Sequence, residues 1–247
     1  MIDQLAETEY YRLRDPHQVR LCPFGEFVHI SGYPSRHDAT LLLDVRCSAG
    51  QVDALLDELE ALYRPLDLSF RKLVTHDRET ASALQDELKS RGWITSCCYI
   101  ATADRTPVRR PNPEVEVRSV PFDHPHLKSI VEVNDGTDNA LPLRGHHDRR
   151  IGGELLIGYL DGEPAGTPGW FVTPGNVARF RAIDTVEPHR GRGVATTLVQ
   201  HVRDHQTVRS AHELCLFCRE DGPWPLYRRL GFRERGRMWE FRRDLSS

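Results

Sequence analysis

Long apolar runs, lysine and cysteine are all scarce in this chain of 247 residues. No apolar run approaches the roughly 18 to 20 residues that a membrane-spanning helix needs, and the acidic, polar N-terminal segment argues against a signal peptide. We therefore expect no membrane partner. Lysine accounts for only three of the 33 basic residues, and the arginines are spread along the whole chain. With 36 acidic residues the formal charge is −3, which argues against binding to nucleic acid by bulk charge.

Six cysteines are too few for a disulfide framework in a chain of this length, which favours a reducing, cytoplasmic environment. Cys215 and Cys218 have the CxxC spacing of some metal and redox sites. They lie in an apolar segment with the character of a strand, where residues three apart face opposite sides, so buried packing is the favoured interpretation. His146, His147 and Asp148 lie in a run of polar loop residues, and we expect no metal site.

The first half of the chain has the pattern of alternating strands and helices. Apolar segments at 37–46, 68–74 and 93–101 are typical of strands. Between them, 48–66 and 79–91 place apolar residues three and four positions apart, which predicts amphipathic helices. Helices between strands imply crossover connections within one sheet.

A proline-rich polar stretch at about 105–118 predicts a domain boundary after this first series. Beyond it, three apolar segments joined by short turns predict an antiparallel meander, followed by a helix, a strand, a short helix and a final strand. In chain order these elements are expected at 115–120 (strand), 124–139 (helix), 155–160, 164–173 and 177–185 (meander), 193–205 (helix), 213–219 (strand), 223–230 (helix) and up to 245 (strand).

The two halves end alike, with LKSRGW closing one series and LYRRLGF closing the other. We interpret this as a diverged internal repeat, and a chance match between two generic α/β segments is the alternative. The expected fold class is therefore α/β, with domains at 1–110 and 113–247. Each domain should contain a mixed central sheet flanked by helices.

The segment 183–198, IDTVEPHRGRGVATTL, carries the most specific functional pattern. A predicted strand runs into a glycine-rich turn that opens a helix, where unpaired N–H groups and the helix dipole favour a phosphate or pyrophosphate. Glycine omits the Cβ that would keep a phosphate away from the amides, and Arg190 and Arg192 add positive charge. The segment lacks the GK[ST] of a P-loop and the GxGxxG of a dinucleotide site. A glycine-rich helix start without a ligand is the alternative.

Two motifs in this half resemble the GCN5-related N-acetyltransferases. Arg190-x-x-Gly193-x-Ala195 matches the Q/R-x-x-G-x-G/A acetyl-CoA signature of that family, and the expected strand and helix flank it. About 37 residues further on, LYRRLGF at 226–232 is similar to the family's Y-x-x-x-G-F segment. The resemblance covers roughly residues 113–247 and implies two acyl-CoA N-acyltransferase-like domains, of which the first is degenerate.

The resemblance also implies roles for individual residues. Main-chain amides of the turn would hold the pyrophosphate of acetyl-CoA, and backbone groups at the end of the preceding strand would pair with the pantetheine arm as an added strand does. Tyr227 would be the general acid that protonates the departing CoA thiolate, and a tyrosine of the core is the alternative. The implied acetyl-CoA-binding residues are Ile183, Thr185, Arg190, Gly191, Arg192, Gly193, Val194 and Ala195.

The reaction implied by the resemblance is direct attack of an amine on the acetyl-CoA thioester, which requires a group to accept the ammonium proton. Arg179 stands where the histone-acetylating branch of the family has its catalytic glutamate, so that base is absent. Asp184 and Glu220 fall near the expected cleft, but structural roles explain them more readily. We expect a primary amine of a small molecule as acceptor, and a monomer or homodimer. A non-catalytic CoA-binding sensor and a phosphate-binding module unrelated to CoA are the alternatives.

In the first domain, the segment that corresponds to the glycine-rich turn is 44–51, DVRCSAGQ. It begins with an acidic residue and lacks the R-x-x-G-x-G pattern, so we expect no CoA binding there. Covering or completing the acceptor site is one role for this domain. A purely structural or oligomeric role is the other.

Overall fold

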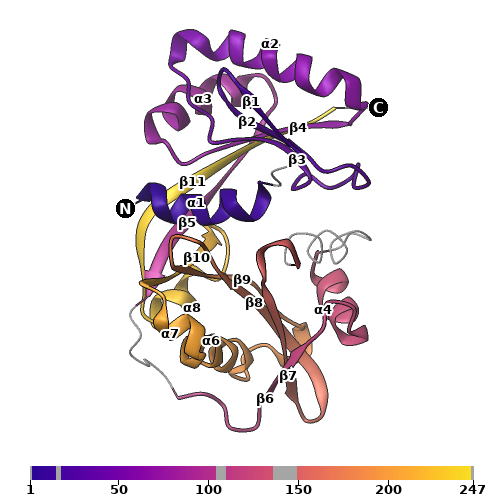
Figure 1. Cartoon of the computed structure of the whole chain (residues 1–247), viewed down its shortest axis with the longest axis vertical. Coiled ribbons are helices and arrows are strands. Elements are labelled where there is room, and N and C mark those ends of the chain that lie inside the picture. The colour runs from indigo at the N-terminus through magenta and orange to yellow at the C-terminus, as the bar shows by residue number, and fades with distance from the viewer. Residues whose placement is uncertain (1, 15–17, 104–109, 136–148, 246–247) are drawn as a thin grey trace. The chain divides into compact units, whose positions relative to one another are not determined.

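The computed structural model describes residues 2–14, 18–103, 110–135 and 149–245, and the element labels follow Figure 1. The helices are α1 (Ile2–Leu13), α2 (Val52–Tyr63), α3 (Arg78–Ser90), α4 (Pro125–Asp135), α6 (Val194–Asp204), α7 (Gln206–Ser210) and α8 (Trp224–Arg229), with 3₁₀ turns η1 (Ala49–Gln51), η2 (Arg64–Leu66) and η3 (Glu187–His189). The strands are β1 (Val19–Cys22), β2 (Gly25–His29), β3 (Thr40–Leu43), β4 (Phe70–Thr75), β5 (Ile94–Ala103), β6 (Glu116–Val120), β7 (Glu154–Leu160), β8 (Glu163–Val172), β9 (Val177–Thr185), β10 (Glu213–Arg219) and β11 (Phe232–Asp244).

The chain divides into two compact units. The first contains Met1–Ile100, Arg219–Gly222 and Arg235–Ser247, and the second contains Ala101–Cys218 and Pro223–Glu234. We expected uninterrupted domains at 1–110 and 113–247, and the difference comes from the C-terminal strand. From Trp239 to Asp244, β11 pairs antiparallel with β4, so the end of the chain belongs to the sheet of the first unit.

In the first unit the strand order is β1-β2-β3-β4-β11-β5. Strands β3 and β4 are parallel, with Leu42 opposite Leu73, as expected for two strands joined by a helical crossover. Helices α2 and α3 follow the predicted segments. Their leucines form one core with residues of β3, β4 and β11, including Leu55, Leu84 and Phe241, each fully buried.

Three elements of the first unit were absent from the sequence prediction, namely α1, β1 and β2. Strands β1 and β2 form a hairpin, and β2 pairs antiparallel with β3. The buried side chains of α1 are Leu5, Ala6, Tyr10 and Leu13, with smaller Thr8 among them. At its N-terminal end, Ile2 lies so close to β11 that a Cβ added to Gly236 would be 2.1 Å from Ile2 Cδ1.

A lysine is buried in the middle of β4. Lys72 is 6% exposed, and its Nζ lies 2.9 Å from Asp38 Oδ1 and 3.1 Å from Glu240 Oε2. A buried ammonium needs such counter-charges to offset its lost hydration. The nearby lysine in turn holds the pKa of Asp38 well below its usual range.

In the second unit the strand order is β10-β9-β8-β7-β6. Strands β7, β8 and β9 form the predicted antiparallel meander, and β10 pairs parallel with β9. Side chains of α6 and α8 pack on one set of strand residues, among them Phe180 and Leu216. Leu127 and Ile130 of α4 pack on alternate residues of β7, such as Ile157, so helices cover both faces of the meander (Figure 1).

All six cysteines are free thiols. Cys215 and Cys218 are both buried on β10, which is the environment that the packing interpretation predicted. Within the described ranges, no helix is long and apolar enough to cross a membrane.

Candidate functional site

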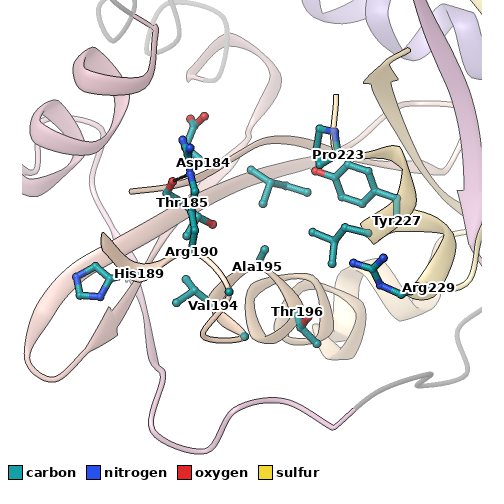
Figure 2. A pocket seen from close by; sticks show the side chains of 14 residues that line it. Asp184, Thr185, His189, Arg190, Val194, Ala195, Thr196, Pro223, Tyr227 and Arg229 are labelled. Carbon is teal, nitrogen blue, oxygen red and sulfur yellow. Dashed lines mark hydrogen bonds between the residues drawn. The ribbon is translucent and has the colours of Figure 1, made fainter. Parts of the chain in front are cut away.

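A cavity of about 680 Å³ opens in the second unit where β9 meets the start of α6. Figure 2 shows its lining side chains, which come from β9, the glycine-rich turn, α6 and α8. The lining residues are Ile183, Asp184, Thr185, His189, Arg190, Gly191, Gly193, Val194, Ala195, Thr196, Pro223, Leu226, Tyr227 and Arg229. The cavity therefore brings Tyr227 together with seven of the eight residues that the resemblance implied for acetyl-CoA.

The parallel pairing of β9 and β10 ends before this cavity begins. Their paired positions run from Val177 with Glu213 to Phe180 with Leu216. Farther along, β9 pairs with β8 alone, up to Thr185 with Gly166. The edge of β9 that carries Ile183 and Thr185 therefore lies past its last pair with β10.

A bulge bends β9 at this point. Thr167 is opposite Asp184, while Gly169 is opposite Arg181, so β9 has one more residue than β8 in this interval. Residue 168 of β8 is a proline, which has no N–H to donate to β9. Bulges of this kind redirect a strand and its side chains, and they occur often beside functional sites.

The turn after β9 has the backbone conformation that glycine favours. Gly191 and Gly193 have φ angles of +76° and +83°, and α6 begins directly after Gly193. A Cβ on Gly193 would lie 3.2 Å from the Cβ of Asn112, whereas a Cβ on Gly191 would meet open space. The first N–H groups of α6 have no partner within the helix, and this end of the helix carries partial positive charge.

Asn112 fixes this turn from outside, a contact that the sequence patterns did not reveal. Its Nδ2 donates to the carbonyl oxygen of Arg192 at 2.9 Å, and its backbone N–H donates to Thr197 Oγ1 at 2.8 Å. The two bonds connect the turn and the first turn of α6 to a segment some 80 residues earlier in the chain.

The two arginines of the turn have different surroundings. Arg190 lines the cavity, and its Nε donates to the carbonyl oxygen of Thr185 at 3.2 Å. The side chain of Arg192 does not line the cavity but forms an exposed ion pair with Asp161, 2.8 Å apart. Arg229 on α8 adds a positive charge to the lining that the motifs did not identify.

Tyr227 lies on α8 and is 6% exposed. Its ring packs edge-on against Phe232 with 5.8 Å between centroids, and its hydroxyl forms no hydrogen bond with any described residue. Figure 2 shows the hydroxyl end directed toward the middle of the lining residues. Burial raises the pKa of Tyr227, and electrostatic interaction with Cys218 and Asp184 adds to the effect, so the phenol stays protonated at neutral pH.

The candidate bases lie in different surroundings. Asp184 lines the cavity, although Figure 2 shows its carboxylate pointing away from Tyr227. Glu220 belongs to the first unit, where Oε1 lies 3.0 Å from Arg237 and accepts a hydrogen bond from Tyr99. Arg179 is buried, with its guanidinium 3.6 Å from the centroid of the Phe217 ring.

In the first unit, a buried histidine lies at the end of β4. His76, which follows β4, is 8% exposed, and its Nδ1 lies 2.9 Å from the hydroxyl of Tyr10 on α1. Its Nε2 lies 2.7 Å from Asp3 and 3.1 Å from Arg46. Side chains of α1 and of the segment after β3 thus surround His76 at the end of β4.

Among the described residues, no group of three or more His, Cys, Asp and Glu side chains is arranged to hold a metal ion. The segment with His146, His147 and Asp148 lies outside the described residues.

The fold is that of the GCN5-related N-acetyltransferase (GNAT) class. The solved structure of a GCN5-related N-acetyltransferase from Kribbella flavida matches 99% of this chain and 95% of its own, with a TM-score of 0.67 and 16% identity. A conserved protein of unknown function from Staphylococcus epidermidis matches 93% of this chain and 94% of its own, with a TM-score of 0.77 and 10% identity. A tandem GNAT protein from the clavulanic acid biosynthesis pathway matches 90% of this chain and 78% of its own, with a TM-score of 0.57 and 16% identity.

The sequence agrees with this assignment. The family model of the acetyltransferase (GNAT) domain matches residues 152–234, which include the meander, the glycine-rich turn and Tyr227. No curated protein matches the sequence. The second unit therefore carries a GNAT acetyltransferase domain, and the chain as a whole has a tandem GNAT fold, as the sequence motifs led us to expect.

Proposed function

We propose that the protein is an N-acetyltransferase that transfers the acetyl group of acetyl-CoA to a primary amine of a small molecule. The observation that carries the proposal is a single cavity that joins the start of α6, the free edge of β9 and the hydroxyl end of Tyr227. An anion site, a strand edge and a protonated phenol in one cavity match the phosphate, amide and sulfur groups of a CoA thioester.

The start of α6 suits a pyrophosphate. The N–H groups of Val194, Ala195 and Thr196 are the unpaired donors at the positive end of an 11-residue helix. Gly191 and Gly193 let the backbone approach these groups without a Cβ in the way. Arg190 and Arg229 supply positive side-chain charge at the same cavity.

The edge of β9 suits the amides of a pantetheine arm. Ile183 and Thr185 line the cavity, and both lie beyond the last pair of β9 with β10. An extended ligand can add to such an edge as a strand does, because the donors and acceptors alternate along it. The bulge opposite Pro168 turns this edge out of the regular ladder.

Acetyl-CoA supplies an acyl group on a sulfur leaving group, and Tyr227 is the residue that acts on that sulfur. Its raised pKa keeps the proton on the phenol, which donates a hydrogen bond to the thiolate as the C–S bond breaks. The ordinary pKa of a thiol, about 8.5, is below that of the phenol, so the hydrogen bond carries more of the stabilisation than complete proton transfer.

The amine must lose a proton as it attacks. Asp184 is the carboxylate that lines the cavity, and it can take this proton through a bridging water. Arg179 replaces the glutamate of the histone-acetylating branch, and the chain carries a second, degenerate unit. These two departures from the protein-acetylating pattern favour a small-molecule acceptor.

Two measurements test the proposal. Acetyl-CoA at 100 times its Kd should stabilise the folded protein by about 2.7 kcal/mol, seen as a rise in Tm, and the gain should be smaller for Arg190→Glu. Release of free thiol from acetyl-CoA in the presence of a panel of primary amines should report turnover. Stabilisation without thiol release from any amine would indicate a CoA-binding sensor. No stabilisation at millimolar acetyl-CoA would refute both functions.

A further inference from the structure

The side chain of Asn112 contacts a single peptide of the glycine-rich turn. Its Nδ2 donates to the carbonyl oxygen of Arg192 at 2.9 Å, and a Cβ on Gly193 would lie 3.2 Å from the Cβ of Asn112. Gly193 lines the cavity that contains Tyr227, whereas Asn112 lies outside the lining. Asn112 therefore holds the Arg192–Gly193 peptide without forming part of the cavity wall.

The segment that carries Asn112 is itself held in place. The Oδ1 of Asn112 accepts from the backbone N–H of Glu114 at 3.0 Å, and its backbone N–H donates to Thr197 Oγ1 at 2.8 Å. Val115, three residues further on, is 7% exposed and packs in one cluster with Leu198 of α6. The backbone bond and the packing of Val115 do not depend on the amide side chain, so the segment should stay docked when that side chain is shortened.

The bond from Asn112 decides the direction of the Gly193 N–H. The Arg192–Gly193 peptide is trans, so its C=O and N–H point in opposite directions and the N–H points away from Asn112. Gly193 has a φ of +83°, and glycine adopts negative φ as readily as positive φ. A flip of this peptide, which changes the sign of that φ, is therefore open to the turn once the bond from Asn112 is removed. The flipped turn would present a carbonyl oxygen where the native turn presents an N–H.

We infer that Asn112 is a positioning residue for acetyl-CoA binding, whose amide holds the Arg192 carbonyl so that the Gly193 N–H is directed to the pyrophosphate. The inference rests on the proposed function, because it takes that pyrophosphate as the ligand of the turn. A flipped peptide would bring a carbonyl oxygen toward the negative charge of the ligand, so it has to revert before the ligand binds. The cost of this reversal raises the Kd and leaves the chemistry at the sulfur unchanged.

Calorimetry with acetyl-CoA tests the inference on Asn112→Ala and on a matched control. Asn112→Ala should raise the Kd by the factor that one hydrogen bond is worth, roughly 3- to 12-fold, while kcat at saturating acetyl-CoA stays within about twofold of the wild-type value. Asn176→Ala is the control, because the Nδ2 of Asn176 also donates to a backbone carbonyl, that of Ser210 at 3.4 Å, and lies outside the cavity lining. It should lower the Tm, since its φ of +58° is unfavourable for alanine, without changing the Kd.

Asn112→Asp tests the direction of the peptide itself. The carboxylate has nearly the shape of the amide and can accept from the Glu114 N–H as before, but it cannot donate to the Arg192 carbonyl. It would instead accept from the N–H of a flipped Gly193. In the protein without ligand, the Gly193 amide should therefore exchange its hydrogen more slowly in Asn112→Asp than in the wild type, and the Kd for acetyl-CoA should rise further than in Asn112→Ala.

Three results would overturn the inference while acetyl-CoA binding by the wild type still stands. These are an unchanged Kd in Asn112→Ala, an equal rise in Kd in Asn112→Ala and Asn176→Ala, and a kcat that falls as far as the Kd rises. Failure of the wild type to bind acetyl-CoA is a separate result, which refutes the proposed function and removes the ligand on which the inference rests.

Discussion

Replacing Tyr227 by phenylalanine removes one hydroxyl group and leaves the other contacts of the side chain in place. The edge-on packing against Phe232 needs only the ring. The hydroxyl has no hydrogen-bond partner among the described residues, so its removal leaves no buried group unsatisfied. We therefore expect the Tm of Tyr227→Phe to lie within roughly 2 °C of the wild-type value.

The effect on turnover should be large. A positioned acid typically contributes about 10²- to 10⁴-fold to the rate, so kcat for thiol release should fall by that factor. The Kd for acetyl-CoA should change by less than about twofold, because the lost interaction forms only as negative charge develops on the sulfur. The raised pKa of Tyr227 also predicts that wild-type kcat does not decline from ionisation of this phenol as the pH rises to about 10.

Tyr63→Phe is the matched control, because it deletes a hydroxyl that does have partners. Tyr63 donates to the carbonyl oxygen of Thr40 at 2.8 Å and accepts from the backbone N–H of Lys72 at 3.2 Å. Its loss should cost about 1–3 kcal/mol of stability, or roughly 2–12 °C in Tm, with kcat unchanged. An unchanged kcat in Tyr227→Phe would remove this residue from the mechanism. A Kd that rises as far as kcat falls would assign it to binding instead.

Three further outcomes follow from the contacts described above. Gly193→Ala should lower the free energy of unfolding in urea by about 1–2 kcal/mol and weaken acetyl-CoA binding measured by calorimetry. The methyl group of Gly191→Ala meets open space, so this variant should lose only the stability that corresponds to its backbone strain. Arg192→Ala should change stability by less than about 0.5 kcal/mol and acetyl-CoA affinity by less than about twofold, and a larger loss of affinity would place its side chain at the ligand. Because Lys72 lowers the pKa of folded Asp38, the Asp38 carboxylate stabilises the protein above its unfolded pKa of about 3.9 and loses this contribution as the pH falls. Asp38→Asn should therefore be less stable at neutral pH. Its stability, measured from unfolding curves, should also depend less steeply on pH in the acid range.

Local patterns were sufficient for most helices and strands. The amphipathic stripes of α2 and α3 and the short turns of the meander are properties of neighbouring residues, and they predicted these elements to within a few positions. Helix α1 was missed, although Ala6, Tyr10 and Leu13 have helical spacing, because its exposed residues are strongly polar. The placement of β11 beside β4 could not be predicted, because pairing between residues about 170 positions apart leaves no local signal.

The site was predictable where it depends on backbone conformation. The glycines with positive φ and the tyrosine at a fixed distance from them form a sequence motif that can be recognised. The support around the turn was not predictable, because Asn112 reaches it from a segment separated by the whole meander. The bulge in β9 has a visible cause in Pro168, but only the register of β8 and β9 identifies the residues that it displaces.

The position of β11 sets an order of events during synthesis. The sheet of the first unit lacks a central strand until residues 235–244 have been made. Until then β4 offers an unpaired edge, which is prone to pair with other chains. The second unit contains only three residues of β11, so it can fold before the rest of that strand has been made. Although most of the first unit precedes the second in the sequence, its sheet is therefore completed only after the residues of the second unit have been made.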